Sequence, residues 1–346
     1  SDGSGWRLQG YWDHSRRDEP VTFRDEMEVM DLDWQHRPAL GAGHNLLWGA
    51  GYRHADDQTQ PSLLVRFIPA QRKLHWLNIY AQDEIALGES FALTLGAKLE
   101  KNIYTGWEFL PSARFVWTPA DSRLAWAALS RSVRAPARLD REFFFPGNAP
   151  FAIRGGPDFV SEVAKVLELG WREQPTPVLS YSVTLFHAHY DRLRSGQPPP
   201  AVVQNMMAGS TSGLEAWGNW QVTRDWRLSG GLNQLHKHLR ILPGSRDPTG
   251  PSALGNDPRH QWLLRSSLNA GVHEIDFSVR RVGALPSPAV PAYTAVDARW
   301  GWHISRELEL SLTMQNLFDR GHPEFGAAPN RAEVRRAAWL KLLWRM

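Results

Sequence analysis

Cysteine is absent from this 346-residue sequence, so disulfide bonds and thiolate metal sites are excluded. Lysine is scarce, because only six of the 39 basic residues are lysine. The sequence also lacks any run of 18 or more apolar residues, and its mean hydropathy is −0.42, so we expect no transmembrane helix. These values do not exclude a membrane-spanning β-barrel, because the strands of such a barrel are only half apolar.

Two further absences concern targeting and partners. The first residues, Ser1–Gly5, show no basic segment followed by an apolar one, so we expect no signal peptide. The chain is then either cytosolic or one whose N-terminal part has been removed. The net charge is only +3, and the arginines are interleaved with acids along the chain, which argues against a nucleic-acid-binding surface.

Strand-like runs of about ten residues fill the chain, and this is the length that a tilted strand needs to cross hydrocarbon. Seventeen tryptophans accompany them, either as core filling or as an interfacial girdle between hydrocarbon and water. The sixteen runs are 5–13, 25–37, 44–55, 73–86, 90–100, 108–117, 123–133, 161–172, 179–190, 212–222, 226–239, 259–270, 272–283, 292–302, 307–317 and 334–346.

The connections between these runs alternate in length. Short turns on one side and long loops on the other are typical of an outer-membrane barrel, with the short turns and both termini in the periplasm. The last run would close the sheet, with Ala338, Leu340, Leu342, Trp344 and Met346 on one outward face. The long connections are 14–24, 56–72, 101–107, 134–160, 191–211, 240–258, 284–291 and 318–333.

Alternation within the runs separates an apolar face from a charged one. In 90–100, Phe91, Leu93 and Leu95 share a face, whereas Lys98 and Glu100 lie on the other. A soluble β-propeller or sandwich would bury the second face, where lone charges cost several kcal/mol each. A large membrane barrel would place it in a wet lumen. The pattern therefore predicts an all-β protein, a transmembrane antiparallel β-barrel.

An ordered set of short motifs resembles the barrel of TonB-dependent outer-membrane receptors. The motifs extend over much of the chain, and their order is more specific than any one of them. They are Leu95–Glu100, Asn102, Tyr104–Gly106, Glu108, Pro111–Arg114, Trp117–Pro119, Leu124–Arg131, Val133–Pro136, Glu168–Arg172, Gly213–Glu215 and Asn316–Asp319.

The resemblance implies a receptor in the bacterial outer membrane that takes up a scarce solute, usually a ferric siderophore, another metal chelate, haem or cobalamin. It implies a 22-stranded barrel filled by an N-terminal plug on which the TonB system acts. It also implies contact with membrane lipid, and recognition of the last strand by the barrel-assembly machinery.

The chain departs from that family pattern, because sixteen strands are predicted and neither a plug nor a TonB box is visible. We therefore interpret residues 1–346 as one unit, the C-terminal portion of the barrel, without the plug and the first strands. The alternative is a self-contained sixteen-stranded porin that conducts solutes passively.

Four arginines, Arg131, Arg134, Arg138 and Arg141, run from the strand 123–133 into the following loop. They could form an electropositive wall that attracts an anionic ligand such as a ferric chelate. The alternative is pairing with the plug or with neighbouring acids such as Glu100 and Glu168. We favour pairing with acids over a ligand-binding role for these arginines.

Two histidine pairs at period two form the second set of candidate ligand-binding residues. They are His187 and His189, followed by Tyr190, and His236 and His238. Each pair shares one strand face and could bind copper, zinc or a haem iron, although ordinary interfacial histidines are the more common case. We assign no metal, no cofactor and no catalytic residue, because no nucleophile, base and orienting group occur together. We therefore expect a protein that is not an enzyme.

Overall fold

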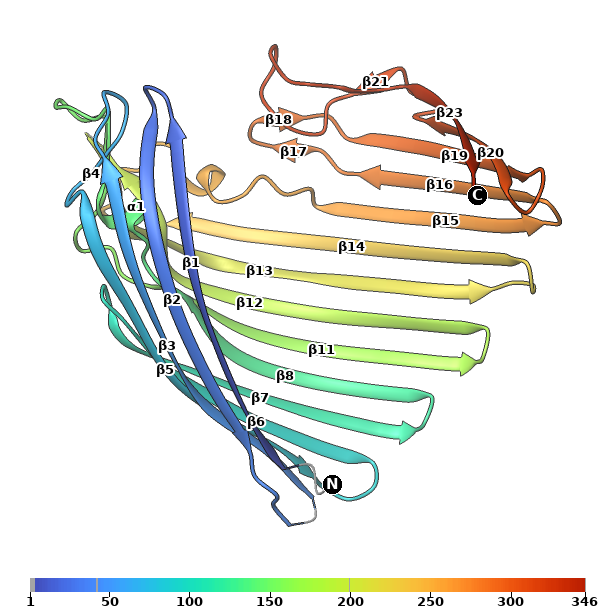
Figure 1. Ribbon diagram of the computed structural model, residues 1–346, viewed down its shortest axis with the longest axis horizontal. Coiled ribbons are helices and arrows are strands. Elements are labelled where there is room, and N and C mark those ends of the chain that lie inside the picture. The colour runs from blue at the N-terminus through green and yellow to red at the C-terminus, as the bar shows by residue number, and fades with distance from the viewer. Residues whose placement is uncertain (1–3, 42, 199, 346) are drawn as a thin grey trace.

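The computed structural model describes residues 4–41, 43–198 and 200–345, and it is almost entirely β-structure. Sixteen long strands follow one another around a single sheet, each antiparallel to the next (Figure 1). They are β1 Gly5–Glu19, β2 Phe23–Arg37, β3 His44–Gln60, β5 Gln71–Ala86, β6 Phe91–Asn102, β7 Gly106–Ala120, β8 Arg123–Arg134, β11 Glu162–Thr176, β12 Leu179–Gln197, β13 Ala201–Gln221, β14 Trp226–Ile241, β15 His260–Ala270, β16 His273–Val282, β19 Tyr293–His303, β20 Leu308–Gln315 and β23 Ala337–Trp344.

The remaining elements are short and lie in the connections. The helical pieces are the α-helix α1, Arg138–Arg141, and a 3-10 turn, Gly250–Ala253. Within the described residues, no helix is long and apolar enough to cross a bilayer. The short strands are β4 Arg66–Phe67, β9 Phe143–Phe145, β10 Ile153–Arg154, β17 Leu285–Pro286, β18 Ala289–Val290, β21 Gly321–His322 and β22 Val334–Arg335.

All sixteen predicted runs are strands, but three of the predicted long connections are wrong. Residues 14–24, 101–107 and 191–211 are mostly paired strand with tight turns, because β1, β6 and β12 continue to Glu19, Asn102 and Gln197. Polar side chains do not end a strand as long as the backbone ladder continues. Opposite charges on facing residues stabilise the β1–β2 ladder, as in the pair Arg24–Asp18 at 2.7 Å.

The two faces of the sheet have the predicted characters. Register places Leu129 opposite Leu167 and Leu95 opposite Ala113, so these side chains share one face, which we call the apolar face. Leu129 is 59% exposed there. The other face, which we call the polar face, carries ion pairs such as those from Arg299 to Glu274, at 2.8 Å, and to Asp276, at 3.1 Å.

Aromatic rings line the short-turn side of the apolar face. Phe91 and Trp117 stack with their ring centroids 6.3 Å apart, and Trp300 and Trp302 stack at the same separation. The indole N–H of Trp171 donates to Glu173 at 3.2 Å. Apolar rings with satisfied N–H groups at one level are typical of an interfacial girdle.

The sheet is open between its first and last strands. Within the described residues, β1 pairs only with β2 and β23 only with β20, so two edges remain. Figure 1 shows the strands curving round as a trough, with β1 and β23 on separate sides. This arrangement does not favour the alternative of a closed sixteen-stranded porin.

The last strand has the predicted face. Leu340 and Leu342 lie opposite Leu312 and Leu310 and are 70% and 63% exposed, and Trp344 lies opposite Leu308. Met346, which was expected on the same face, lies outside the described residues.

The small buried core lies at the loop end of the sheet. The connection 135–161, which we call the mouth loop, contains α1, β9 and β10 and folds against the polar side of the neighbouring strands. Gly156 lies so close to β13 that an added Cβ would come within 1.7 Å of the Val203 carbonyl oxygen. Phe159 and Met207 are among the most buried side chains of the described residues, at 1% and 0% exposure. The loop therefore has a fixed position on the sheet.

Candidate functional site

Arg138 lies in the first turn of α1 and is buried, with its side chain 5% exposed. Its guanidinium contacts Glu142 Oε2 at 2.8 Å and Asp57 Oδ2 at 3.2 Å, and it donates to the Pro69 carbonyl. It also lies over the Phe67 ring, 5.0 Å from the centroid. These contacts use its donors, so Arg138 fixes the mouth loop to β3 rather than facing a ligand.

Tyr104, in the turn between β6 and β7, extends this cluster. Its hydroxyl donates to Glu142 Oε1 at 3.1 Å, and Arg72 lies 3.3 Å from the same oxygen. Burial, together with the neighbouring Glu142 carboxylate, raises the pKa of Tyr104, which keeps the phenol protonated. Arg141 donates to the Tyr104 carbonyl oxygen at 2.9 Å. The cluster is therefore internally satisfied.

Arg134, on the polar face of β8, forms a second network. It contacts Asp140 Oδ2 at 2.8 Å and Glu162, and it lies over the Phe159 ring. Arg194 reaches Asp140 Oδ1 at 3.3 Å. The sequence favours charge pairing of these arginines over a ligand site. The structure shows such pairing, but with acids other than the expected Glu100 and Glu168.

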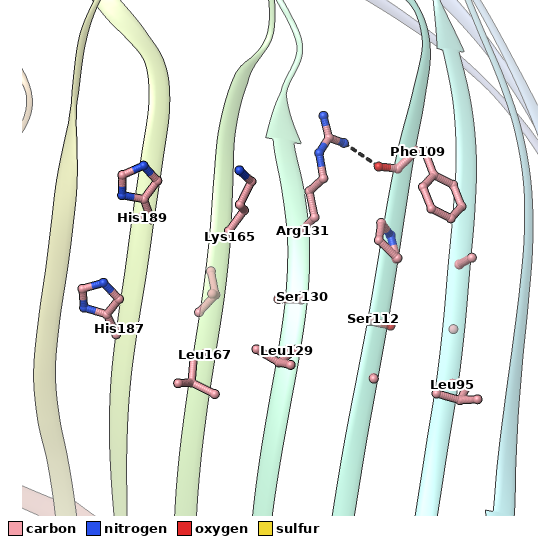
Figure 2. Close-up of a pocket in the computed structure, with 15 residues that line it drawn as sticks. Leu95, Phe109, Ser112, Leu129, Ser130, Arg131, Lys165, Leu167, His187 and His189 are labelled. Carbon is pink, nitrogen blue, oxygen red and sulfur yellow. Dashed lines mark hydrogen bonds between the residues drawn. The ribbon is translucent and has the colours of Figure 1, made fainter.

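Arg131 does not share a face with Arg134, because residues three apart on a strand point to opposite sides. Its guanidinium donates to the Phe109 carbonyl and lies 3.4 Å from Glu108 Oε2. Register places it opposite Lys165, and Lys165 opposite His189. Figure 2 shows these three side chains level with one another across neighbouring strands of the apolar face. The four arginines thus do not form one electropositive wall.

Both histidine pairs also lie on the apolar face. His187 and His236 are each opposite Ser212, and His189 and His238 are each opposite Ser210, so β13 separates the pairs. The two pairs are therefore two strand spacings, roughly 10 Å, apart along the sheet. Among the described residues, no group of three or more His, Asp or Glu side chains is arranged to hold a metal.

Tyr190 points to the opposite face from the histidine that precedes it. Its hydroxyl lies 3.3 Å from Thr211 Oγ1. Tyr190 and His189 therefore cannot contact the same ligand on one face of the sheet, and the structure does not bring the sequence-derived candidates together in one place.

Two cavities are lined by arginines that were not among the candidate residues from the sequence. At the loop end, Arg154, Asp158 and Gln204 line a cavity of about 340 Å³. On the polar face, Arg227 and Arg265 line one of about 390 Å³. In the part of the chain that the structure describes, these three arginines form no ion pair. No local sequence signal distinguishes a free arginine from a paired one, because the pairing depends on register and loop path.

The Asn316–Asp319 motif forms a turn after β20. Asn316 is 1% exposed with φ of 54°, and its Nδ2 donates to the Val334 carbonyl oxygen at 3.0 Å. Asp319 accepts from the Gly321 N–H at 3.1 Å. The motif thus attaches the last long connection to the sheet.

Comparison with solved structures shows the same fold. The siderophore receptor PirA from Pseudomonas aeruginosa matches with a TM-score of 0.73 at 17% identity, over 98% of this chain and 60% of that one. PirA from Acinetobacter baumannii matches with a TM-score of 0.76 at 13% identity, over 98% and 60%. The FrpB iron transporter from Neisseria meningitidis matches with a TM-score of 0.73 at 15% identity, over 92% and 55%.

This chain therefore spans about 60% of the length of the two PirA structures. None of the curated proteins matches it. A family model, TonB dependent receptor-like β-barrel, matches residues 2–317. The chain belongs to this family of TonB-dependent receptor β-barrels.

Proposed function

We propose that this chain is the barrel portion of a bacterial outer-membrane receptor that captures a ferric siderophore or another metal chelate. Uptake would be energised by TonB through a plug domain outside residues 1–346. The observation that carries the proposal is the family match over residues 2–317, and likeness to siderophore receptors supports it. No observation favours passive conduction.

The two faces of the sheet support a place in the membrane. Along β11, the apolar face presents Leu167, Leu169 and Trp171 between Lys165 and Glu173. From Lys165 to Glu173 the strand covers about 26 Å along its axis, or about 20 Å of bilayer height at a tilt of about 40°, which is most of the roughly 25 Å apolar band of an outer-membrane barrel. The exposed apolar face of β23 would be the surface that the barrel-assembly machinery recognises.

The loop-end cavity is the place where we expect an anionic chelate to bind. Arg154 lines it with Gln204, and its guanidinium has no ion-pair partner among the described residues. A free guanidinium at the mouth would attract anions and donate charge-assisted hydrogen bonds to a chelate. Arg134 and Arg138 would hold the mouth loop in position and would not contact the chelate.

The test is binding of ferric chelates to the full chain in maltoside detergent, measured by quenching of tryptophan fluorescence. We expect saturable binding of at least one anionic ferric siderophore. R154Q should weaken it by roughly tenfold or more, since a hydrogen bond to a charged group contributes about 1.5–3 kcal/mol. R306Q, in an exposed turn at the other end, should have no effect. Lack of saturable binding by catecholate, hydroxamate and carboxylate ferric chelates would contradict the proposal.

A further inference from the structure

A hollow on the apolar face, which we call the outer groove, has a cavity volume of about 690 Å³. Its floor is made of small or aliphatic residues, and Leu95, Ala113, Leu129 and Leu167 are among them. Gly96 and Ala97 leave space between the larger side chains. The lining extends across β6, β7, β8, β11 and β12, so a long apolar chain could lie in the groove.

Cross-strand register arranges the groove in levels. Arg131, Lys165 and His189 form the level nearest the loop end. Leu129, Leu167 and His187 form the next level, as Figure 2 also shows. Below that, Ala127, Leu169 and Leu185 are all apolar. The surface therefore changes from cationic to apolar within two levels.

Two acids lie near the cationic level, and the two cations keep hydrogen-bond donors beyond their contacts with these acids. Asp191 contacts Lys165 Nζ at 3.5 Å and His189 Nε2 at 3.2 Å, and Glu108 contacts Arg131 at 3.4 Å. Lys165 is 63% exposed and His189 46%. An ammonium has three donors and a guanidinium five, so both cations retain donors for a further anion.

We propose that the outer groove binds an anionic, phosphate-headed lipid of the surrounding membrane, which rests on the proposed location in the outer membrane. The headgroup phosphate would accept hydrogen bonds from Arg131 and Lys165. One acyl chain would lie over Leu129 and Leu167. A soluble phosphate is the poorer occupant, because most of the floor offers it no donor.

The position of the cations along the strands indicates the depth at which the groove would lie in the bilayer. Lys165 is the last basic residue on the apolar face of β11 before Leu167, Leu169 and Trp171. Cations at that boundary lie where lipid phosphates lie, and each contributes to binding an anionic surface. Arg131 and Lys165 are thus a pair of adjacent cations at headgroup level, directly beside an apolar channel.

The test measures lipid binding to the full chain in maltoside detergent by native mass spectrometry. Phosphatidic acid and phosphatidylcholine with the same acyl chains are compared. The variant R131Q/K165Q removes the two cations, and R131K/K165R keeps the charge. The matched control R227Q/R265Q removes two arginines from the polar face. Insertion is measured separately, by flotation with phosphatidylcholine vesicles.

We expect phosphatidic acid to bind more tightly than phosphatidylcholine. R131Q/K165Q should weaken phosphatidic acid binding roughly thirtyfold, because each basic residue near an anionic lipid surface contributes about 1 kcal/mol to binding. R131K/K165R should retain the binding, and the control should be unchanged. Equal binding of the two lipids, equal loss in the control, or competition by millimolar inorganic phosphate would overturn the inference.

The flotation result separates this inference from the proposed function. Insertion into vesicles without any headgroup preference would overturn only the lipid site. Failure to insert would overturn both the lipid site and the proposed membrane location. Chelate binding is measured independently of either result.

Discussion

Arginine has three different roles in this molecule, and its surroundings decide which. Arg138 is buried between two carboxylates and is part of the structure. Arg131 lies at the rim of the outer groove, where it still has free donors. Arg154 lines a cavity at the mouth without an ion pair among the described residues. Of the three, Arg154 is the best placed to meet a soluble ligand.

Replacing Arg138 by methionine should destabilise the mouth loop strongly. The Asp57 carboxylate, 10% exposed, would be left buried without its cation, and Glu142, 8% exposed, would keep only Arg72 as an ion-pair partner. Breaking a buried pair in this way costs about 3–5 kcal/mol. We expect a loss of that size in the free energy of unfolding of R138M, measured by urea titration in detergent micelles.

Two further variants make this prediction specific. R306M, an exposed arginine in a short turn, should change the free energy of unfolding very little. Adding D57N and E142Q to R138M should recover part of the loss, because no buried charge then lacks a partner. A loss below about 1 kcal/mol for R138M would contradict the assigned role.

At the scale of elements, the connections are held by a few buried polar anchors. The loop 242–259 between β14 and β15 is fixed through Asp247, which is 6% exposed. Its carboxylate accepts from the N–H groups of Gly196 at 2.6 Å, Thr249 at 2.9 Å and Gly250 at 3.1 Å. The bond to Gly196 joins this loop to the β12–β13 hairpin.

The Asp247 anchor should depend on pH. Burial alone raises the pKa of Asp247, but the hydrogen bonds from Gly196, Thr249 and Gly250 outweigh it, so its pKa lies below the usual value. A lowered folded-state pKa means that its contribution is present above the ordinary carboxyl pKa and is lost as pH falls through the folded pKa. The Gly196 amide should therefore lose protection from hydrogen exchange only in acid.

D247N should show the loosened loop already at neutral pH, as faster exchange at Gly196 and faster proteolysis within 242–259. D257N is the matched control, because Asp257 accepts from Lys237 alone among the described residues, at 2.9 Å, and is more exposed. Wild-type protection at Gly196 that stays constant into strong acid, after correction for intrinsic rates, would rule out this role for Asp247.

At the scale of the whole molecule, the two free edges are the main physical problem. β1 and β23 each have one partner among the described strands, and all residues of β1 are exposed. Unpaired strand edges recruit other strands, and unpaired backbone groups are costly in hydrocarbon. The 346-residue chain alone should therefore not form a stable pore.

Single-channel recording in a planar bilayer checks this expectation. The refolded chain should associate with the bilayer but give only irregular leak, without openings of uniform conductance. Stable openings of uniform conductance would instead mean that β1 and β23 close around a lumen, as in a porin. The same sample in vesicles can be compared by heat-dependent mobility in gels, which reports a closed barrel.

The sixteen strands and the two faces could be predicted because side-chain alternation is a local property of an extended chain. The same alternation places Leu129 and Arg131 on one face of the sheet and Arg134 on the other. Spacing along the strand is therefore enough to exclude one electropositive wall that contains both arginines. The polar stretches 14–24 and 191–211 were mistaken for loops, because their pairing comes from cross-strand backbone ladders that carry no local apolar signal.

Thus the sequence by itself determined the strand number, the apolar face and the family. Only the tertiary structure decided which carboxylates neutralise Arg134 and Arg138, that Arg154 remains free, and that a groove forms between Arg131 and Leu95. These features join residues tens of positions apart. They depend on strand register and on the path of the mouth loop, which are set by packing of the whole sheet and not by any segment alone.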